Sequence, residues 1–244
     1  MKTVLAINSS KRKKNTYKVL IQIKNILEKN DISVEIINLY DYNIDTCIGC
    51  EKCILTDKCV LQKDDVNFIF NKVEKSDGII LSSPVYLQSV SGKLKTLIDR
   101  TCVWFHRPIV YGKPIMCVST TKGSGLKKTL DYLESVVLQW GAINSKSIGR
   151  NVRNIDKEVE FKEVKNFLDL LNKNKKDYKP SINSLINFQV QKVLSNHMID
   201  EDDKYWTDKG WKDEIYYFTC KINPAKKILV NGFYKMMNSK MKAK

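Results

Sequence analysis

The sequence has little histidine, a deficit of acidic residues and no long apolar run. Its two histidines, His106 and His197, have no partner at a spacing typical of metal ligands, and neither a Ser/His/Asp order nor a paired acidic motif stands out. These absences disfavour a histidine-based metal centre and a hydrolase. Because no apolar stretch approaches the roughly 20 residues that cross a bilayer, we also expect no membrane span.

An export signal is not recognisable either. The apolar run Met1–Asn8 is too short for a signal peptide, and basic residues follow where a cleavage site would stand. Seven cysteines, an odd number, do not suit a structural disulfide framework. We therefore predict a cytoplasmic protein with reduced thiols, in which Met1–Asn8 forms the first buried strand.

Basic residues outnumber acidic residues by 42 to 27, which gives a formal net charge of +15. Such a charge suits nucleic acid, an anionic membrane or a phosphorylated ligand. The lysines are spread over every segment, however, and no basic stretch carries interleaved aromatics or a helix-turn-helix pattern. A basic solvated surface is therefore the simpler explanation, and we do not expect nucleic acid as a partner.

Four cysteines lie close together in the segment 45–62, with the spacing C-x2-C-x2-C-x5-C. Thiolates at this density can surround one metal centre without distant ligands. Ferredoxin-type loops use similar short spacings for a [4Fe–4S] cluster, whereas zinc sites more often use two pairs separated by a long knuckle. The sequence favours a cluster over zinc or metal-free thiols, with Cys47, Cys50, Cys53 and Cys59 as ligands.

The remaining cysteines are expected to lie outside this site. Cys117 falls within a buried strand pattern, and Cys102 follows a helix face, where cysteine behaves as a small apolar residue. Cys220 belongs to a different part of the chain.

Up to about residue 175, short β-branched runs alternate with amphipathic helical patterns, which indicates an α/β fold with a parallel sheet covered on both faces. Five such units suit a flavodoxin-like doubly wound sheet, in which ligands bind at the carboxyl ends of the strands. The loops after the first, third and fourth strands should therefore meet at one site. Strands are expected at residues 2–8, 32–39, 78–83, 113–120 and 142–148.

The first of these loops combines small polar side chains with cations and leads into a helix. A helix N-terminus offers free N–H groups and positive partial charge to an anion. The loop contains neither GxGxxG nor GxxxxGK[ST]. It therefore predicts either a phosphate site or a plain helix cap beside exposed lysines. The candidate phosphate-binding residues are Ser9, Ser10, Lys11, Asn15 and Thr16.

The other two loops supply a rigid turn, an aromatic side chain and glycines that permit close backbone approach. Either loop alone would be an ordinary turn. Together they could enclose a flat heterocycle and bind its edge. The candidate residues are Pro84, Val85, Tyr86, Leu87, Ser119, Thr120, Thr121, Gly123 and Gly125.

These features together resemble the flavodoxin-like NAD(P)H-dependent FMN reductase family and, within it, the iron-sulfur flavoproteins. The first loop is similar to the family's Gly-Ser-Pro-Arg-x-x-x-Asn-Thr phosphate loop, with Ser9, Lys11, Asn15 and Thr16 on matching positions. Ser10 replaces the usual proline, and Lys11 replaces arginine, which keeps the charge but loses the bidentate fork.

Two further segments extend this resemblance over residues 1–150. Ser83-Pro-Val-Tyr86 and the following Lys93–Arg100 are similar to the flavin-side loop and helix of the family. The compact cysteine run is similar to the cluster loop of iron-sulfur flavoproteins.

The resemblance implies FMN as a cofactor, a [4Fe–4S] cluster, NAD(P)H as electron donor and a homodimer or higher homo-oligomer. The implied acceptor is a small molecule such as a quinone, a nitro compound or free flavin, with the flavin rather than a side chain carrying the chemistry. The alternative is an electron carrier that accepts electrons from ferredoxin. A non-redox interaction module without FMN is a third possibility.

Beyond Tyr178 the alternation of strands and helices stops. We therefore divide the chain into an FMN-binding domain, residues 1–178, and a helical C-terminal extension, residues 179–244. Trp206 and Trp211 lie in a charged stretch of this extension and need a surface to pack on. They either fix the extension to its own body or cover a flavin site or subunit interface.

Overall fold

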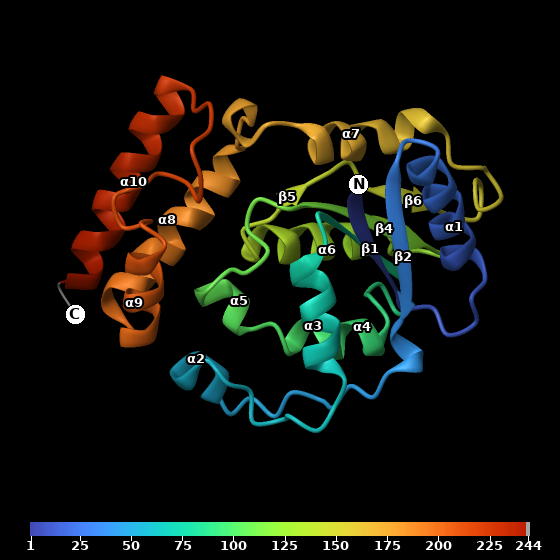
Figure 1. The fold of residues 1–244 in the computed structure, drawn as a ribbon, viewed down its shortest axis with the longest axis horizontal. Helices are drawn as coiled ribbons and strands as arrows, with labels where there is room; N and C mark the ends of the chain where they lie inside the picture. Colours follow the sequence, from blue (N-terminus) through green and yellow to red (C-terminus); the bar gives the residue numbers. More distant parts are fainter. Residues whose placement is uncertain (243–244) are drawn as a thin grey trace.

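A computed structural model describes residues 1–242 and shows a parallel sheet between two layers of helices (Figure 1). The strand order is β2-β1-β3-β4-β5, and β6 also pairs with β4. This order confirms the flavodoxin-like doubly wound fold. The strands are β1 (Lys2–Asn8), β2 (Ile32–Asn38), β3 (Gly78–Pro84), β4 (Pro114–Thr120), β5 (Ile143–Asn144) and β6 (Ile148–Arg150).

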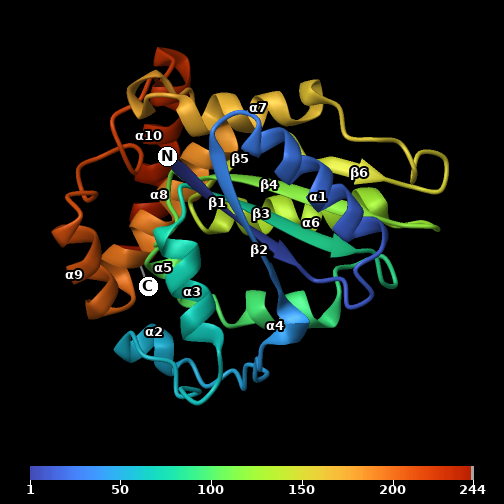
Figure 2. The ribbon, with the colours of Figure 1, turned by 45° about the vertical axis from the view of Figure 1, so that its right-hand side comes forward.

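Apolar side chains of each central strand pack on both faces of the sheet, because successive residues point to opposite sides. In β1, Val4 and Ala6 pack into one core layer, while Leu5 and Ile7 pack into the other. Figures 1 and 2 show the corresponding helices on the two sides. One side carries α1 (Asn15–Glu28) and α7 (Phe161–Asn172), and the other carries α3 (Val66–Lys75), α4 (Gly92–Asp99) and α6 (Leu126–Gln139).

The expected fifth strand, residues 142–148, is divided into β5 and β6. Between them, backbone and side-chain groups bind partners on neighbouring helices: the amide of Lys146 donates to Oδ1 of Asn166 at 2.9 Å, and the hydroxyl of Ser147 donates to Oε1 of Glu134 at 2.6 Å. These bonds interrupt the pairing with β4. The fifth position of the sheet therefore consists of two short strands in place of one continuous strand.

The long connection from β2 to α3 contains the cysteine segment. It includes the short helices η1 (Leu39–Asp41) and α2 (Lys52–Thr56). Figures 1 and 2 both show α2 on the side of α3, near α5 (Val103–His106), the short helix after α4.

The C-terminal extension packs against one end of the α/β domain, beside α5 and α6 (Figure 1). Trp206 and Trp211 are buried in its aromatic core, and Trp206 donates to the carbonyl of His106 at 2.8 Å. The two tryptophans thus pack within the extension, and Trp206 also joins it to the body of the protein at α5. None of the helices within residues 1–242 is long and apolar enough to cross a membrane. The helices of the extension are α8 (Ile182–His197), α9 (Asp200–Asp208) and α10 (Pro224–Lys242), and η2 (Lys175–Asp177) precedes them.

Candidate functional site

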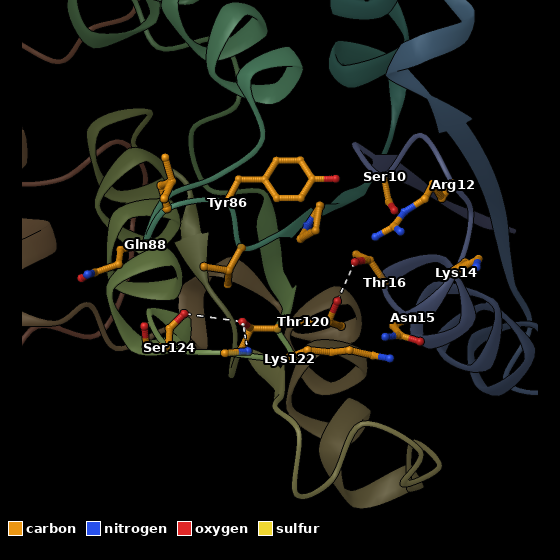
Figure 3. Close-up of a pocket in the computed structure, with 15 residues that line it drawn as sticks. Ser10, Arg12, Lys14, Asn15, Thr16, Tyr86, Gln88, Thr120, Lys122 and Ser124 are labelled. Atoms are coloured by element: carbon orange, nitrogen blue, oxygen red, sulfur yellow. Dashed lines mark hydrogen bonds between the residues drawn. The ribbon is translucent and has the colours of Figure 1, made fainter.

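A cavity of about 610 Å³ opens at the carboxyl ends of β1, β3 and β4 (Figure 3). The loops after these strands meet there, as the sequence predicts. Most of the candidate residues from all three loops line its wall: Ser10, Asn15, Thr16, Pro84, Val85, Tyr86, Leu87, Thr120, Thr121 and Gly123.

The first loop is shaped by the buried side chain of Asn8. Its Nδ2 donates to the carbonyl of Ser10 at 3.1 Å, and its Oδ1 accepts from the Ser10 amide at 3.2 Å. Lys13 then adopts a left-handed backbone with φ 47°, and α1 begins at Asn15. No side chain of the described residues caps the first turn of α1. Its N–H groups therefore stay available to an anion.

Cations line the cavity that the first loop opens onto. Arg12, Lys14 and Lys122 all lie on its wall, and none of the described residues lining it is acidic. Figure 3 shows Lys122 extending toward Asn15 from the opposite loop. Sequence reasoning missed these three cations, because the sequence does not reveal which lysine and arginine side chains of a loop face a cavity.

Four candidate residues lie off the cavity wall. Ser9 and Ser119 are fully buried, and their hydroxyls donate to the carbonyls of Ser82 and Ser83, at 2.8 and 2.9 Å. These bonds tie the strand ends together. Lys11 is exposed at the loop tip, and Gly125 supports the neighbouring turn. A direct role of any of these four residues in binding stays a prediction.

A tight turn after β3 forms the opposite rim of the cavity. Tyr86 and Ser89 exchange two backbone hydrogen bonds, at 2.8 and 3.0 Å, and the residues between them, Leu87 and Gln88, have φ of 46° and 66°. A left-handed leucine is strained, and such strain is often found at functional sites. Gly125 has φ +90°, and a Cβ atom there would lie 2.6 Å from the Cα of Gln88.

The loop after β4 connects the two rims. The hydroxyls of Thr120 and Thr16 lie 2.7 Å apart, and the hydroxyl of Thr121 accepts from the amide of Gly123 at 3.0 Å (Figure 3). Thr120 thus links the end of β4 to the first turn of α1.

A second cavity, of about 380 Å³, lies beside the cysteine loop, and all four predicted ligands line it. Cys102 lines it too, and its Sγ lies 3.4 Å from Sγ of Cys53. The interpretation of Cys102 as an apolar residue beside a helix face is therefore wrong. Cys102 lies between α4 and α5, and α5 contacts α2 of the cysteine loop.

Several cysteine thiols line this cavity, and such a set of donors fits a thiolate-bound cluster. Within residues 1–242, however, no three His, Cys, Asp or Glu side chains are arranged to hold a metal ion. The loop as it stands is thus not closed around one point. Desolvation and the neighbouring Cys53 raise the pKa of Cys102 to about 12, so this thiol stays protonated at neutral pH. Cys117 is fully buried in β4, as expected.

A buried arginine fixes the base of the cysteine loop. Arg100 donates to the carbonyls of Asp45 and Leu61, at 3.0 and 2.8 Å, and forms an ion pair with Asp64. Burial acts to raise the pKa of Asp64, but hydrogen bonds from Arg100 and from backbone amides outweigh it, and the pKa lies below its ordinary value. The two ends of the loop, at Asp45 and Leu61, are thereby held together.

Comparison with solved structures places the fold in the flavodoxin-like class. RosB with a bound 8-demethyl-8-formylriboflavin-5'-phosphate intermediate superposes with a TM-score of 0.58 at 10% identity, over 92% of each chain. A flavone reductase superposes with a TM-score of 0.52 at 17% identity, over 69% of this chain and 60% of that one.

Sequence comparison gives the family. The family model of NADPH-dependent FMN reductases matches residues 2–157. An iron-sulfur flavoprotein of Archaeoglobus fulgidus is 30% identical over an alignment of 222 residues, which covers 86% of this chain and 100% of the relative. An iron-sulfur flavoprotein of Clostridioides difficile (strain 630) is 30% identical over 85% of this chain and 98% of its own. The chain belongs to the NADPH-dependent FMN reductase family, in its iron-sulfur flavoprotein branch, and is a flavin oxidoreductase.

Proposed function

We propose that this protein binds FMN in the larger cavity and transfers electrons from NAD(P)H to a small acceptor such as a quinone, a nitro compound or a flavin. The observation that carries the proposal is the composition of the cavity. One end offers uncapped helix amides, hydroxyls and cations, and the other offers an exposed aromatic turn. A phosphate-bearing flat heterocycle needs this combination.

At the first end, the chain's own groups would hold the FMN phosphate. The N–H groups of the first turn of α1 and the Ser10 hydroxyl supply neutral donors, and Arg12 supplies a charged fork. Lys122 adds a second charge from the loop after β4. These groups bind and orient the cofactor without taking part in its chemistry.

At the other end, the turn Tyr86–Ser89 and the loop 120–124 would enclose the isoalloxazine. Tyr86 is 45% exposed, which leaves ring surface for stacking, and the 120–124 loop would lie against the flavin edge. When bound, FMN supplies hydride acceptance and electron transfer, so the protein contributes position, exclusion of water and electrostatics.

We further propose that Cys47, Cys50, Cys53 and Cys59 hold a [4Fe–4S] cluster. The support is the donor set, since four thiols from one loop line one cavity. Anaerobic reconstitution should give about four iron and four sulfide per chain. Stoichiometric zinc, or protein that retains no metal, would contradict the cluster.

One spectrum of anaerobically purified protein tests both cofactors, because flavin and cluster absorb differently. Addition of NADH or NADPH should then bleach the flavin bands. Colourless protein that does not bind added FMN would reject the proposal and would favour a non-redox module.

A second candidate function is electron transfer from ferredoxin, with the cluster receiving single electrons. The exposed position of Cys50 and the net charge of +15 favour an acidic protein donor. Steady-state oxidation of NAD(P)H, compared with oxidation of reduced ferredoxin, separates the two functions.

We also propose that the protein self-associates and that it works in a reducing, cytoplasmic compartment. Ile48, Leu55 and Val60 are exposed apolar residues around the cysteine loop, and Leu87 is fully exposed at the cavity rim. A second copy of the chain would cover such surfaces. Sedimentation velocity should show a dimer or larger homo-oligomer.

A further inference from the structure

A second buried arginine, Arg107, joins the cysteine loop to the C-terminal extension. Its side chain is 4% exposed. Nη2 donates to the carbonyls of Cys53 and Ile54, at 2.9 and 2.7 Å, and Nε donates to Oδ1 of Asp57 at 3.2 Å. Nη1 donates to Oδ1 of Asp202, in the first turn of α9. One guanidinium therefore contacts both parts of the molecule.

The short helix α2 depends on this guanidinium at its C-terminal end. The last carbonyl groups of a helix have no partner within the helix. Arg107 binds two of them, one of which belongs to the predicted ligand Cys53. Helix α2 has five residues and is followed by a left-handed residue, Asp57, so it is too short to be stable alone. Loss of the guanidinium should therefore release the segment that carries Cys53.

Asp202 holds Arg107 in place from the extension. Its side chain is 1% exposed, and its second oxygen lies 2.8 Å from Nδ1 of His106. Trp206, one turn further along α9, binds the carbonyl of the same histidine. A buried carboxylate needs such partners, because an unpaired buried charge is costly. The position of the guanidinium is thus set by the docking of α9.

We propose that Arg107 and Asp202 position the cysteine loop, so that the C-terminal extension controls the redox centre of the α/β domain. This inference rests on the proposed cluster at that loop. Neither residue donates a ligand, and both act through the backbone around Cys53. Their charges act as well: the guanidinium favours the reduced, more negative cluster, and the carboxylate opposes this effect.

Hydrogen exchange of the metal-free, full-length protein tests the positioning role. Arg107→Met and Asp202→Asn should each speed exchange in residues 52–57 by at least about tenfold, the expected effect of losing one charge-assisted hydrogen bond. Alkylation of Cys53 should accelerate in parallel, while β1 and β4 stay protected. Exchange and alkylation at wild-type rates in both variants would overturn the proposal.

The matched control is Glu163→Gln, which breaks the pair between another buried arginine and a partly buried carboxylate. Arg150 and Glu163 lie 2.9 Å apart in β6 and α7, away from the cysteine loop. This variant should leave exchange in the loop unchanged. If Asp202→Asn does not fold, Arg107→Lys gives the same test, because lysine keeps the charge but cannot bind both α2 carbonyls and Asp202 together.

The midpoint potential of the reconstituted cluster separates the effect of the two charges on the cluster from a loosening of the cysteine loop. Asp202→Asn should raise the potential, and Arg107→Met should lower it. A shift in the same direction in both variants would overturn the electrostatic coupling. If wild-type protein assembles no cluster, the proposed function fails, whereas the exchange measurement still decides whether the extension orders the loop.

Discussion

The side chains of Asn8, Ser9 and Ser119 bind backbone groups at the carboxyl ends of the strands, and so fix the loops around the larger cavity. Small polar residues at strand ends thus serve two different purposes. Ser10 faces the cavity, whereas its neighbour Ser9 is turned into the sheet. Alternation along an extended chain explains this difference, because successive side chains point to opposite sides.

The turn that follows Ser10 gives a prediction for the cations. Arg12 lines the cavity and Lys11 does not. Arg12→Ala should weaken FMN binding by roughly tenfold to hundredfold, the loss of a charge-assisted hydrogen bond. Lys11→Ala is the matched control and should have a much smaller effect in the same fluorescence titration. A larger effect at Lys11 would show that this loop holds the phosphate differently.

Asn15 and Thr16 supply two neutral donors at the start of α1. Replacing both by alanine should weaken FMN binding roughly fivefold to hundredfold, at about 0.5–1.5 kcal/mol for each hydrogen bond. Asn25→Ala, on the exposed face of the same helix, controls for changes in helix stability. Unchanged FMN titration in the double variant would remove this loop from the phosphate site.

At the scale of elements, the turn Tyr86–Ser89 needs close support from the loop before α6. Gly125 supplies it, since its left-handed backbone and missing Cβ admit the Cα of Gln88. Gly125→Ala should cost at least about 1 kcal/mol of unfolding free energy and weaken FMN binding. Gly123→Ala controls for the stability effect, because a Cβ there meets nothing within 4 Å. Urea unfolding measures the stability of both variants.

The base of the cysteine loop should respond to acid through the Arg100–Asp64 pair. The folded-state pKa of Asp64 lies below its ordinary value. The stabilisation is therefore complete above the unfolded pKa of about 4 and is lost as the pH falls through the folded pKa. Asp64→Asn should be less stable than wild type at pH 7, and the difference should shrink in acid.

Urea unfolding at a series of pH values measures this difference. Asp169→Asn, at an exposed ion pair with Lys165, is the control and should change stability little at any pH. A difference between wild type and Asp64→Asn that does not vary with pH would contradict the linkage.

At the scale of the whole molecule, the larger cavity and the extension are separate. No residue from 179–242 lines the larger cavity, whereas Asp202 contacts the arginine that holds the cysteine loop. A chain ending at Tyr178 should therefore keep FMN binding in a titration but show faster hydrogen exchange in α2. Loss of FMN binding from a truncated chain with a native circular dichroism spectrum would contradict this separation.

The sequence by itself determined the features that depend on local pattern. Alternating apolar residues, such as Leu5 and Ile7 against Val4 and Ala6, specify a strand buried on both faces. Because the carboxyl ends of parallel strands meet at one edge, the sequence also placed three loops around one cavity. Four cysteines within one short segment lie near one another in any compact fold.

Only the tertiary structure decided the contacts between distant segments. Cys102 reaches Cys53 across 49 residues, and Arg107 meets Asp202 across 95. No local periodicity encodes such pairs, since they depend on how α5 and α9 pack after the sheet has formed. The inward orientation of Arg12 likewise follows from the left-handed turn at Lys13, because one residue with positive φ redirects the side chains around it.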